Sequence, residues 1–153
     1  HVDPLDPATL IDMFRDDPRA SLLGTDALRD GIDVPGESLR LVVMEGVPWT
    51  KPSVLNAARR RASESPTAYD DRAVRARLAQ AFGRLIRRAD DAGQFVILSS
   101  AMPSRLLSAF PPDVPILRLP LDEATERVRS RLGSRVNLGQ EAPESSGGVQ
   151  SLE

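Results

Sequence analysis

The chain has 153 residues, one histidine, no cysteine and a formal net charge of −2 at pH 7. This length suits one compact domain, and the lack of cysteine excludes disulfide bonds and cysteine-held metal or iron–sulfur centres within the sequence. The charge excludes a protein that is basic over its whole surface, so contacts with nucleic acid must be local. We predict no metal-binding residues. We also predict no membrane partner and a cytoplasmic protein, because no apolar run approaches about 20 residues and no signal peptide is evident.

Short apolar runs alternate with helical patterns along the chain, which is typical of a parallel sheet covered by helices. We therefore predict an α/β domain over residues 1–135. The expected helices span residues 7–16, 54–63, 71–89, 103–109 and 122–132, and the first has Asp6 as its N-cap. The expected strands span residues 20–25, 39–47, 94–100 and 114–120, the last at the edge of the sheet. Residues 136–153 lack apolar periodicity and are predicted to form a flexible tail.

The helix expected at 71–89 has a polar stripe on one side and an apolar stripe on the other. Gln80, Arg84 and Arg87 follow the spacing i, i+4, i+7 and fall within roughly 60° of one another on a helical wheel. The side expected to pack on the sheet carries the apolar residues Val74, Leu78, Phe82, Leu85 and Ala89. Gly83 flanks the polar stripe, although glycine inside a helix costs about 1 kcal/mol relative to alanine. Either this face is a solvated arginine surface with an incidental glycine, or glycine lets another body approach closely.

Two segments of the sequence match motifs of a known enzyme superfamily. The segment "QAFGRLIR" at 80–87 resembles motif VI of superfamily 2 helicases, which reads Gln or His, two residues, Gly-Arg, two residues and Arg. The segment "GTDALRDGIDVPG" at 24–36 resembles motif V of the same superfamily. The stretch "GIDVPGESLRLVVMEGVPW", together with arginines 59–61 and Tyr69 ahead of motif VI, is similar to the DinG/XPD-type, iron–sulfur helicase-like branch. The resemblance covers about residues 14–120.

This resemblance implies the second RecA-like lobe of an ATP-driven DNA helicase, a three-layer domain with a mainly parallel sheet. In such motors ATP and Mg²⁺ lie between two lobes, and the first lobe supplies the phosphate-binding loop and the magnesium carboxylates. The implied partners are this N-terminal lobe and single-stranded or forked DNA. Because neither the loop nor the acidic magnesium box occurs in the sequence, we expect the chain alone to be inactive. An iron–sulfur cluster, where the branch has one, would belong to the first lobe.

By the same resemblance, motif VI supplies the catalytic residues. Arg87 is the predicted arginine finger, and Arg84 reaches the γ-phosphate beside it. An arginine in this position accelerates phosphoryl transfer roughly 10³- to 10⁵-fold in related systems. Gln80 is expected to sense the phosphate or the attacking water, and Gly83 to let the helix lie close to the opposite lobe.

Motif V is expected to contact both nucleotide and DNA, because the loop follows a predicted strand and open α/β sheets bind ligands at the carboxyl ends of their strands. The resemblance assigns Gly31 and Asp33 to the nucleotide, and Thr25 and Asp26 to the DNA backbone. Asp-Gly and Pro-Gly pairs are also ordinary turn sequence, so a plain turn is the alternative reading. Arg59 is a further candidate for DNA binding, although three successive arginines point to different sides of a helix and often stay solvated.

The sequence also departs from the helicase pattern in two ways. Ala81 replaces the second glycine of motif VI, and the strand and helix that normally open the second lobe are absent before the matched region. These departures leave an alternative function, a non-catalytic, helicase-derived module whose arginine stripe binds an acidic protein patch or a nucleic-acid backbone. Trp49, which follows Pro48, is interpreted either as a stacking platform for a base or as packing within a turn.

Overall fold

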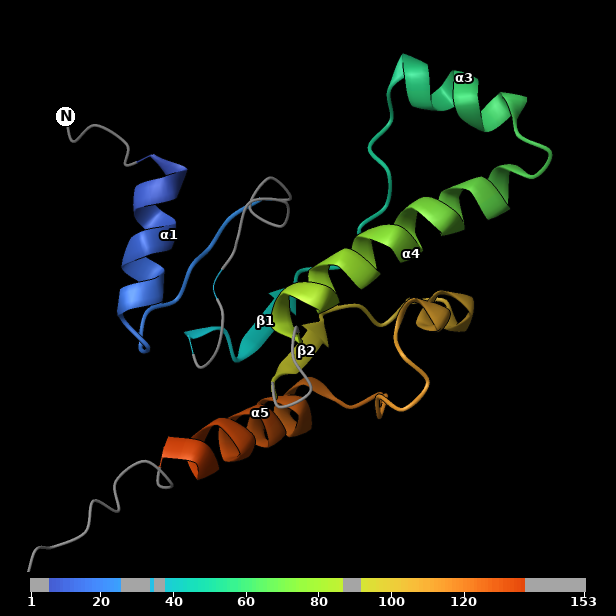
Figure 1. Cartoon of the computed structure of the whole chain (residues 1–153). Helices are drawn as coiled ribbons and strands as arrows, with labels where there is room; N and C mark the ends of the chain where they lie inside the picture. The colour runs from blue at the N-terminus through green and yellow to red at the C-terminus, as the bar shows by residue number, and fades with distance from the viewer. Residues whose placement is uncertain (1–5, 26–33, 35–37, 87–91, 137–153) are drawn as a thin grey trace, which may run out of the picture. The chain divides into compact units, whose positions relative to one another are not determined.

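The computed structural model describes residues 6–25, 34, 38–86 and 92–136 (Figure 1). The chain divides into two units, His1–Pro115 and Ile116–Glu153, and each is described by itself. In the order of the chain, the described elements are α1, β1, α3, α4, β2 and the short 3₁₀ helix η2 in the first unit, followed by α5 in the second. The predicted boundary between a domain ending at residue 135 and a tail over 136–153 stays a prediction.

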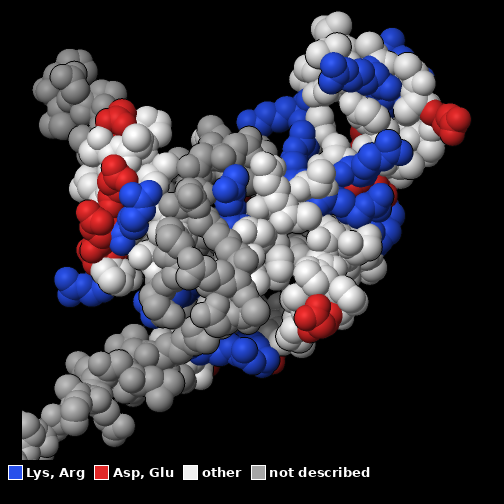
Figure 2. Space-filling view, in the orientation of Figure 1, with Lys and Arg blue, Asp and Glu red and all other residues white. Residues whose placement is uncertain are grey.

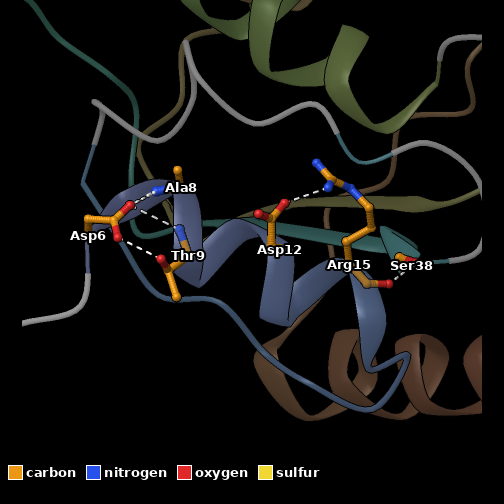
Figure 3. A network of polar contacts seen from close by, with 6 residues as sticks. All are labelled: Asp6, Ala8, Thr9, Asp12, Arg15 and Ser38. Atoms are coloured by element: carbon orange, nitrogen blue, oxygen red, sulfur yellow. Dashed lines mark hydrogen bonds and ion pairs between the residues drawn. The ribbon is translucent and has the colours of Figure 1, made fainter.

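Helix α1 spans Pro7–Asp16, as the sequence predicts. Asp6 caps its first turn, because one carboxylate oxygen accepts hydrogen bonds from the amides of Ala8 at 2.9 Å and Thr9 at 3.1 Å (Figure 3). The Thr9 hydroxyl donates to the other oxygen at 2.6 Å. These bonds favour the ionised carboxylate, and the Thr9 hydroxyl first of all holds the pKa of Asp6 below its ordinary value.

The end of α1 is tied to the segment that leads into the sheet. The Ser38 hydroxyl donates to the carbonyl oxygen of Arg15 at 3.0 Å, across 23 positions of sequence (Figure 3). The Arg15 guanidinium pairs with Asp12 one turn earlier, at 2.6 Å. Phe14 is the buried residue of the helix, so α1 attaches to the unit through its carboxyl end.

The described sheet consists of two parallel strands, β1 over Leu41–Met44 and β2 over Gln94–Ile97. In the register Met44 lies opposite Ile97, and Val42 lies opposite Phe95. Both strands fall inside the predicted ranges 39–47 and 94–100 and are shorter. A parallel pair agrees with the predicted α/β class, whereas a three-layer arrangement with a larger sheet is not seen in the described residues.

Two predicted strands are wrong. Residues 20–25 and 114–120 are described and form no strand. Their apolar side chains do not pack in a sheet, since Leu23 is 92% exposed and Leu117 is 52% exposed. An apolar run becomes a strand only when a neighbouring strand satisfies its amides and carbonyls, and prolines at both ends of the second run remove donors.

Helices α3, over Val54–Ala62, and α4, over Pro66–Leu85, form a hairpin. Each begins at a serine whose hydroxyl accepts an amide hydrogen bond from the first turn, Ser53 from Asn56 and Ser65 from Ala68. The α3 prediction of 54–63 is confirmed to within one residue. Helix α4 starts five residues before the predicted position 71, because the Ser65 cap and a proline in the first turn initiate it there.

The carboxyl end of α4 also differs from the prediction. The helix ends at Leu85, and Ile86 is extended, with φ −119° and ψ 107°. The Ile86 amide still donates to the Phe82 carbonyl oxygen at 3.1 Å, which closes the last turn. The sequence predicts helix through Ala89, but residues 87–89 lie outside the described part of the chain.

The core lies between α4, the strand pair and η2, which spans Ser104–Ala109. Its buried centre consists of Val74, Leu78, Met102 and Leu106. Met44 and Ile97 pack against this cluster, so α4 covers the sheet face that carries them (Figure 1). Three phenylalanine rings extend the packing edge to face at centroid distances of 5.5–5.9 Å, Phe82, Phe95 and Phe110. The helix predicted at 103–109 is therefore present, but as a 3₁₀ helix.

The second unit contains α5, which spans Leu121–Val136. It includes the predicted range 122–132 and extends beyond both ends of it. Asp122 and Glu123 lie in its first turn, where carboxylates interact favourably with the helix dipole. None of the helices that the structure describes is both long enough and apolar enough to cross a membrane.

Candidate functional site

The described residues of the predicted polar stripe, Gln80 and Arg84, lie on the side of α4 that faces away from the buried core residues. Gln80 is exposed and Arg84 is half-buried, while Val74, Leu78 and Leu85 are buried on the opposite side. The predicted division of the helix into an apolar and a polar face is confirmed for these residues. Arg87, the predicted arginine finger, lies outside the described residues.

Gly83 lies in the last turn of α4 and is exposed. A Cβ atom placed on Gly83 would meet nothing within 4 Å beyond its own helix backbone and chain neighbours. No contact described in this chain therefore requires glycine at this position. Glycine here is either incidental, or it leaves room for a body outside the chain.

The residues of motif V are mostly outside the described part of the chain, and this holds for Asp26, Gly31 and Asp33. Thr25 is described and exposed. The segment before it forms no strand, so the prediction that motif V follows the carboxyl end of a strand is not supported. Val34, inside the motif, is described and is 1% exposed.

Basic side chains gather over the α3–α4 hairpin (Figure 2). Arg59 is exposed in the last turn of α3, and Arg60 beside it pairs with Asp70 of α4 at 2.7 Å. Glu64 is the acidic residue between the two helices. Arg59 and the motif VI residues lie on different parts of the hairpin, because Gln80 is 10 positions along α4 from Asp70.

A groove of about 350 Å³ lies between this hairpin and the turn that precedes it. Its lining includes two aromatic rings, two basic groups, an amide and a carboxylate, from Trp49, Lys51, Asn56, Arg60, Tyr69 and Asp70. The sequence singled out Trp49, but nothing in it indicated that these side chains would meet. In the parts of the chain that the structure describes, no group of three or more histidine and acidic side chains is arranged to hold a metal ion.

Arg77 holds the turn that carries Trp49. One guanidinium nitrogen, Nη1, donates to the carbonyl oxygen of Pro48 at 3.0 Å and to the hydroxyl of Thr50 at 2.9 Å. The Trp49 amide donates to the carbonyl oxygen of Val47 at 2.8 Å, which makes the turn tight. Sequence reasoning missed this role of Arg77, because its only local sign is an arginine within a helix rich in arginines.

A second missed residue is Asp71, which is buried in α4. Its Oδ2 atom pairs with Nε of Arg105 at 2.7 Å and so joins α4 to η2. The other oxygen, Oδ1, is buried and accepts no hydrogen bond from the described residues. The local sequence shows only two adjacent aspartates, and the partner that decides which one is buried comes 34 positions later.

The comparisons with known proteins agree on one family. Residues 3–113 match the helicase C-terminal domain family. The ATP-dependent helicase DinG of Mycobacterium tuberculosis (strain H37Rv) is 40% identical over 101 residues, which cover 62% of this chain and 15% of that protein. The 3'-5' exonuclease DinG of Bacillus subtilis (strain 168) is 34% identical over 99 residues, which cover 60% of this chain and 10% of that protein. No solved structure matches the chain significantly. The chain belongs to the helicase C-terminal domain family and is DinG-like.

Proposed function

We propose that this chain is the second motor lobe of a DinG-type ATP-dependent DNA helicase. Its family membership supports the general assignment. The observation that carries the finer proposal is the division of α4, which buries Val74, Leu78 and Leu85 and turns Gln80 and Gly83 away from the core. In the proposed enzyme a first lobe faces this exposed side, and ATP is bound and hydrolysed between the two.

In this proposal motif VI acts on the phosphoryl group during transfer. Arg87 inserts across the interface as the arginine finger, and Arg84 lies against the γ-phosphate. Negative charge spreads over the phosphoryl oxygens in the transition state, and a planar guanidinium matches that charge with paired hydrogen bonds. Gln80 orients the attacking water or senses the phosphate. The absence of a side chain at Gly83 lets the opposite lobe approach the helix backbone.

The magnesium ligands and the phosphate-binding loop come from the first lobe in this proposal. The chain has no cysteine, so an iron–sulfur cluster would also be held elsewhere in the protein. From motif V, Gly31 and Asp33 contact the nucleotide, and Thr25 and Asp26 contact the DNA backbone. Arg59 adds a phosphate contact from the exposed face of α3. A cytoplasmic location belongs to the same proposal.

A second candidate is a non-catalytic module that binds an acidic protein patch or a nucleic-acid backbone. The basic surface over α3 and α4 is the observation that favours it (Figure 2). Such binding would weaken strongly with salt, because it depends on neutralising phosphates or carboxylates. The two candidates differ in one property, turnover of ATP.

The test is ATP hydrolysis by the longest natural reading frame that contains this sequence, with and without single-stranded DNA. We expect DNA to stimulate turnover, and Arg87→Ala to lower it at least ~10³-fold while ATP binding stays nearly intact. Arg129→Ala is the matched control, because Arg129 is exposed on α5 and pairs only locally with Glu126 among the bonds described. Normal turnover in Arg87→Ala would overturn the finger assignment, and no turnover in any protein would favour the binding module.

A further inference from the structure

The groove beside the α3–α4 hairpin is lined by aromatic and charged side chains, none of which is assigned to the proposed ATP site. Trp49 is 47% exposed at its edge, although the preceding Pro48 is buried. Tyr69 contributes a second, half-buried ring from the first turn of α4. A half-exposed tryptophan buries little apolar surface in the core, so packing alone does not explain this residue. Its position at the groove suggests that it binds a ligand there.

The turn is held in place by bonds from both helices of the hairpin. Arg77 on α4 donates to the residues on either side of Trp49, as described above. Asn56 on α3 donates from its side-chain nitrogen to the carbonyl oxygen of Lys51 at 3.2 Å. The indole is therefore carried by a turn fixed before any ligand arrives, which lowers the entropy lost on binding.

The charges around the groove favour an anionic ligand. The charged side chains that line the groove are Lys51, Arg60 and Asp70, and the surrounding residues 49–72 contain five basic and three acidic side chains. Asp70 pairs with Arg60 at 2.7 Å within the lining, so the lining has a net charge of +1, which comes from Lys51. Lys51, the only lysine of the chain, is exposed at the lip of the groove next to the tryptophan.

We propose that this groove binds one base of a single-stranded nucleic acid, with the base stacked on Trp49 and a neighbouring phosphate against Lys51. Aromatic rings beside basic groups are the combination that binds single strands without sequence preference, because every base has a π face. The volume of about 350 Å³ lies in the range of small-ligand sites, roughly 300–1,000 Å³. The proposal rests on the functions proposed above, because a motor lobe of this kind travels along such a strand and the alternative binding module holds a nucleic-acid backbone.

The experiment measures binding of a fluorescein-labelled oligothymidine of about 12 nucleotides to the longest reading frame, by anisotropy at two salt concentrations. We expect Trp49→Ala to weaken binding ~10-fold, corresponding to one lost stacking contact, and Trp49→Phe to restore most of the affinity. Lys51→Gln should lower the salt dependence by about one phosphate contact. Val54→Ala is the matched control, since Val54 is 90% exposed nearby and does not line the groove.

Tryptophan fluorescence gives an independent measurement. The difference between the emission of wild type and Trp49→Phe isolates the signal of Trp49, and oligothymidine should quench it. Inorganic polyphosphate, which has no bases, should bind without quenching. Circular dichroism melting curves establish that each variant is folded.

The outcomes separate this proposal from the motor function. If Arg87→Ala abolishes DNA-stimulated turnover but Trp49→Ala keeps its affinity, the motor proposal stands and the groove proposal falls. If oligothymidine quenches Trp49 and Trp49→Ala weakens binding in a protein without turnover, the groove stands and the motor falls. Equal quenching by polyphosphate and oligothymidine would overturn base stacking in favour of a surface for polyanions.

Discussion

Packing within the chain explains the residue types on one face of α4 but not those on the other. On the buried face, Val74 and Leu78 pack with residues of η2 and the strand pair, Leu85 is buried, and Asp71 is paired with Arg105. On the opposite face, the space around Gly83 is open, and Gln80 is exposed. The first set of residues is explained by packing within the chain, and the second is not. Residues whose type the fold does not require are those most usefully tested for function.

The largest expected effect is on the buried face. Leu78→Ala removes a fully buried side chain from the centre of the core and should lower the free energy of unfolding by about 2–5 kcal/mol. Gln80→Ala, two positions later on the exposed face, should change it by less than about 0.5 kcal/mol. Chemical denaturation of both variants measures the difference. Equal losses of stability would show that the exposed face is packed against something within the chain.

A smaller effect is expected from the ion pair between the buried Asp71 and the half-exposed Arg105. Arg105→Ala leaves the carboxylate of Asp71 inside the protein without its partner, which should cost about 1–3 kcal/mol. The neighbouring pair provides the control. Arg60→Ala breaks the bridge to Asp70, which is 27% exposed, and should cost no more than about 1 kcal/mol. A larger loss in Arg60→Ala than in Arg105→Ala would contradict the assignment of Asp71 to the buried face.

The smallest expected effect is an increase in the free energy of unfolding. Gly83→Ala should raise the free energy of unfolding by about 0.5–1 kcal/mol, because alanine favours helix and the added methyl group meets nothing. In the proposed motor the same variant should lower DNA-stimulated turnover, because the methyl group would keep the proposed first lobe away from the helix. Gly133→Ala on α5 is the control, because the space around Gly133 is also open. This variant should raise the free energy of unfolding by a similar amount without lowering turnover. Full turnover in Gly83→Ala would identify the glycine as incidental.

Helix positions were largely predictable from the sequence, whereas two of the four predicted strands are confirmed and two are wrong. The first helix is fixed by neighbours in sequence, with Asp6 as cap and Pro7 in the first turn. The start of α4 carries the same kind of signal in Ser65 and Pro66, which the apolar pattern alone did not reveal. The wrong strands at 20–25 and 114–120 have the right composition, but strand pairing is decided by segments distant in the sequence.

The candidate site divides in the same way. The polar stripe was predicted from the spacing of Gln80 and Arg84 along one helix, and the exposed position of Gln80 agrees with that prediction. The groove was not found, because Trp49, Asn56 and Tyr69 come from a turn and two helices that meet only in the fold. The burial of Asp71 likewise depends on Arg105, which no local pattern connects to it.

The continuity of α4 has a mechanical consequence. The helix has 20 residues without a break, so it is about 30 Å long and stiff over that length. Tyr69 and Asp70 line the groove near one end, and Gln80 and Arg84 lie near the other. Because the helix is stiff, any tilt of α4 relative to the sheet moves both of its ends. A nucleic-acid strand bound at the groove and a nucleotide bound near Gln80 and Arg84 would therefore contact opposite ends of the same rigid helix.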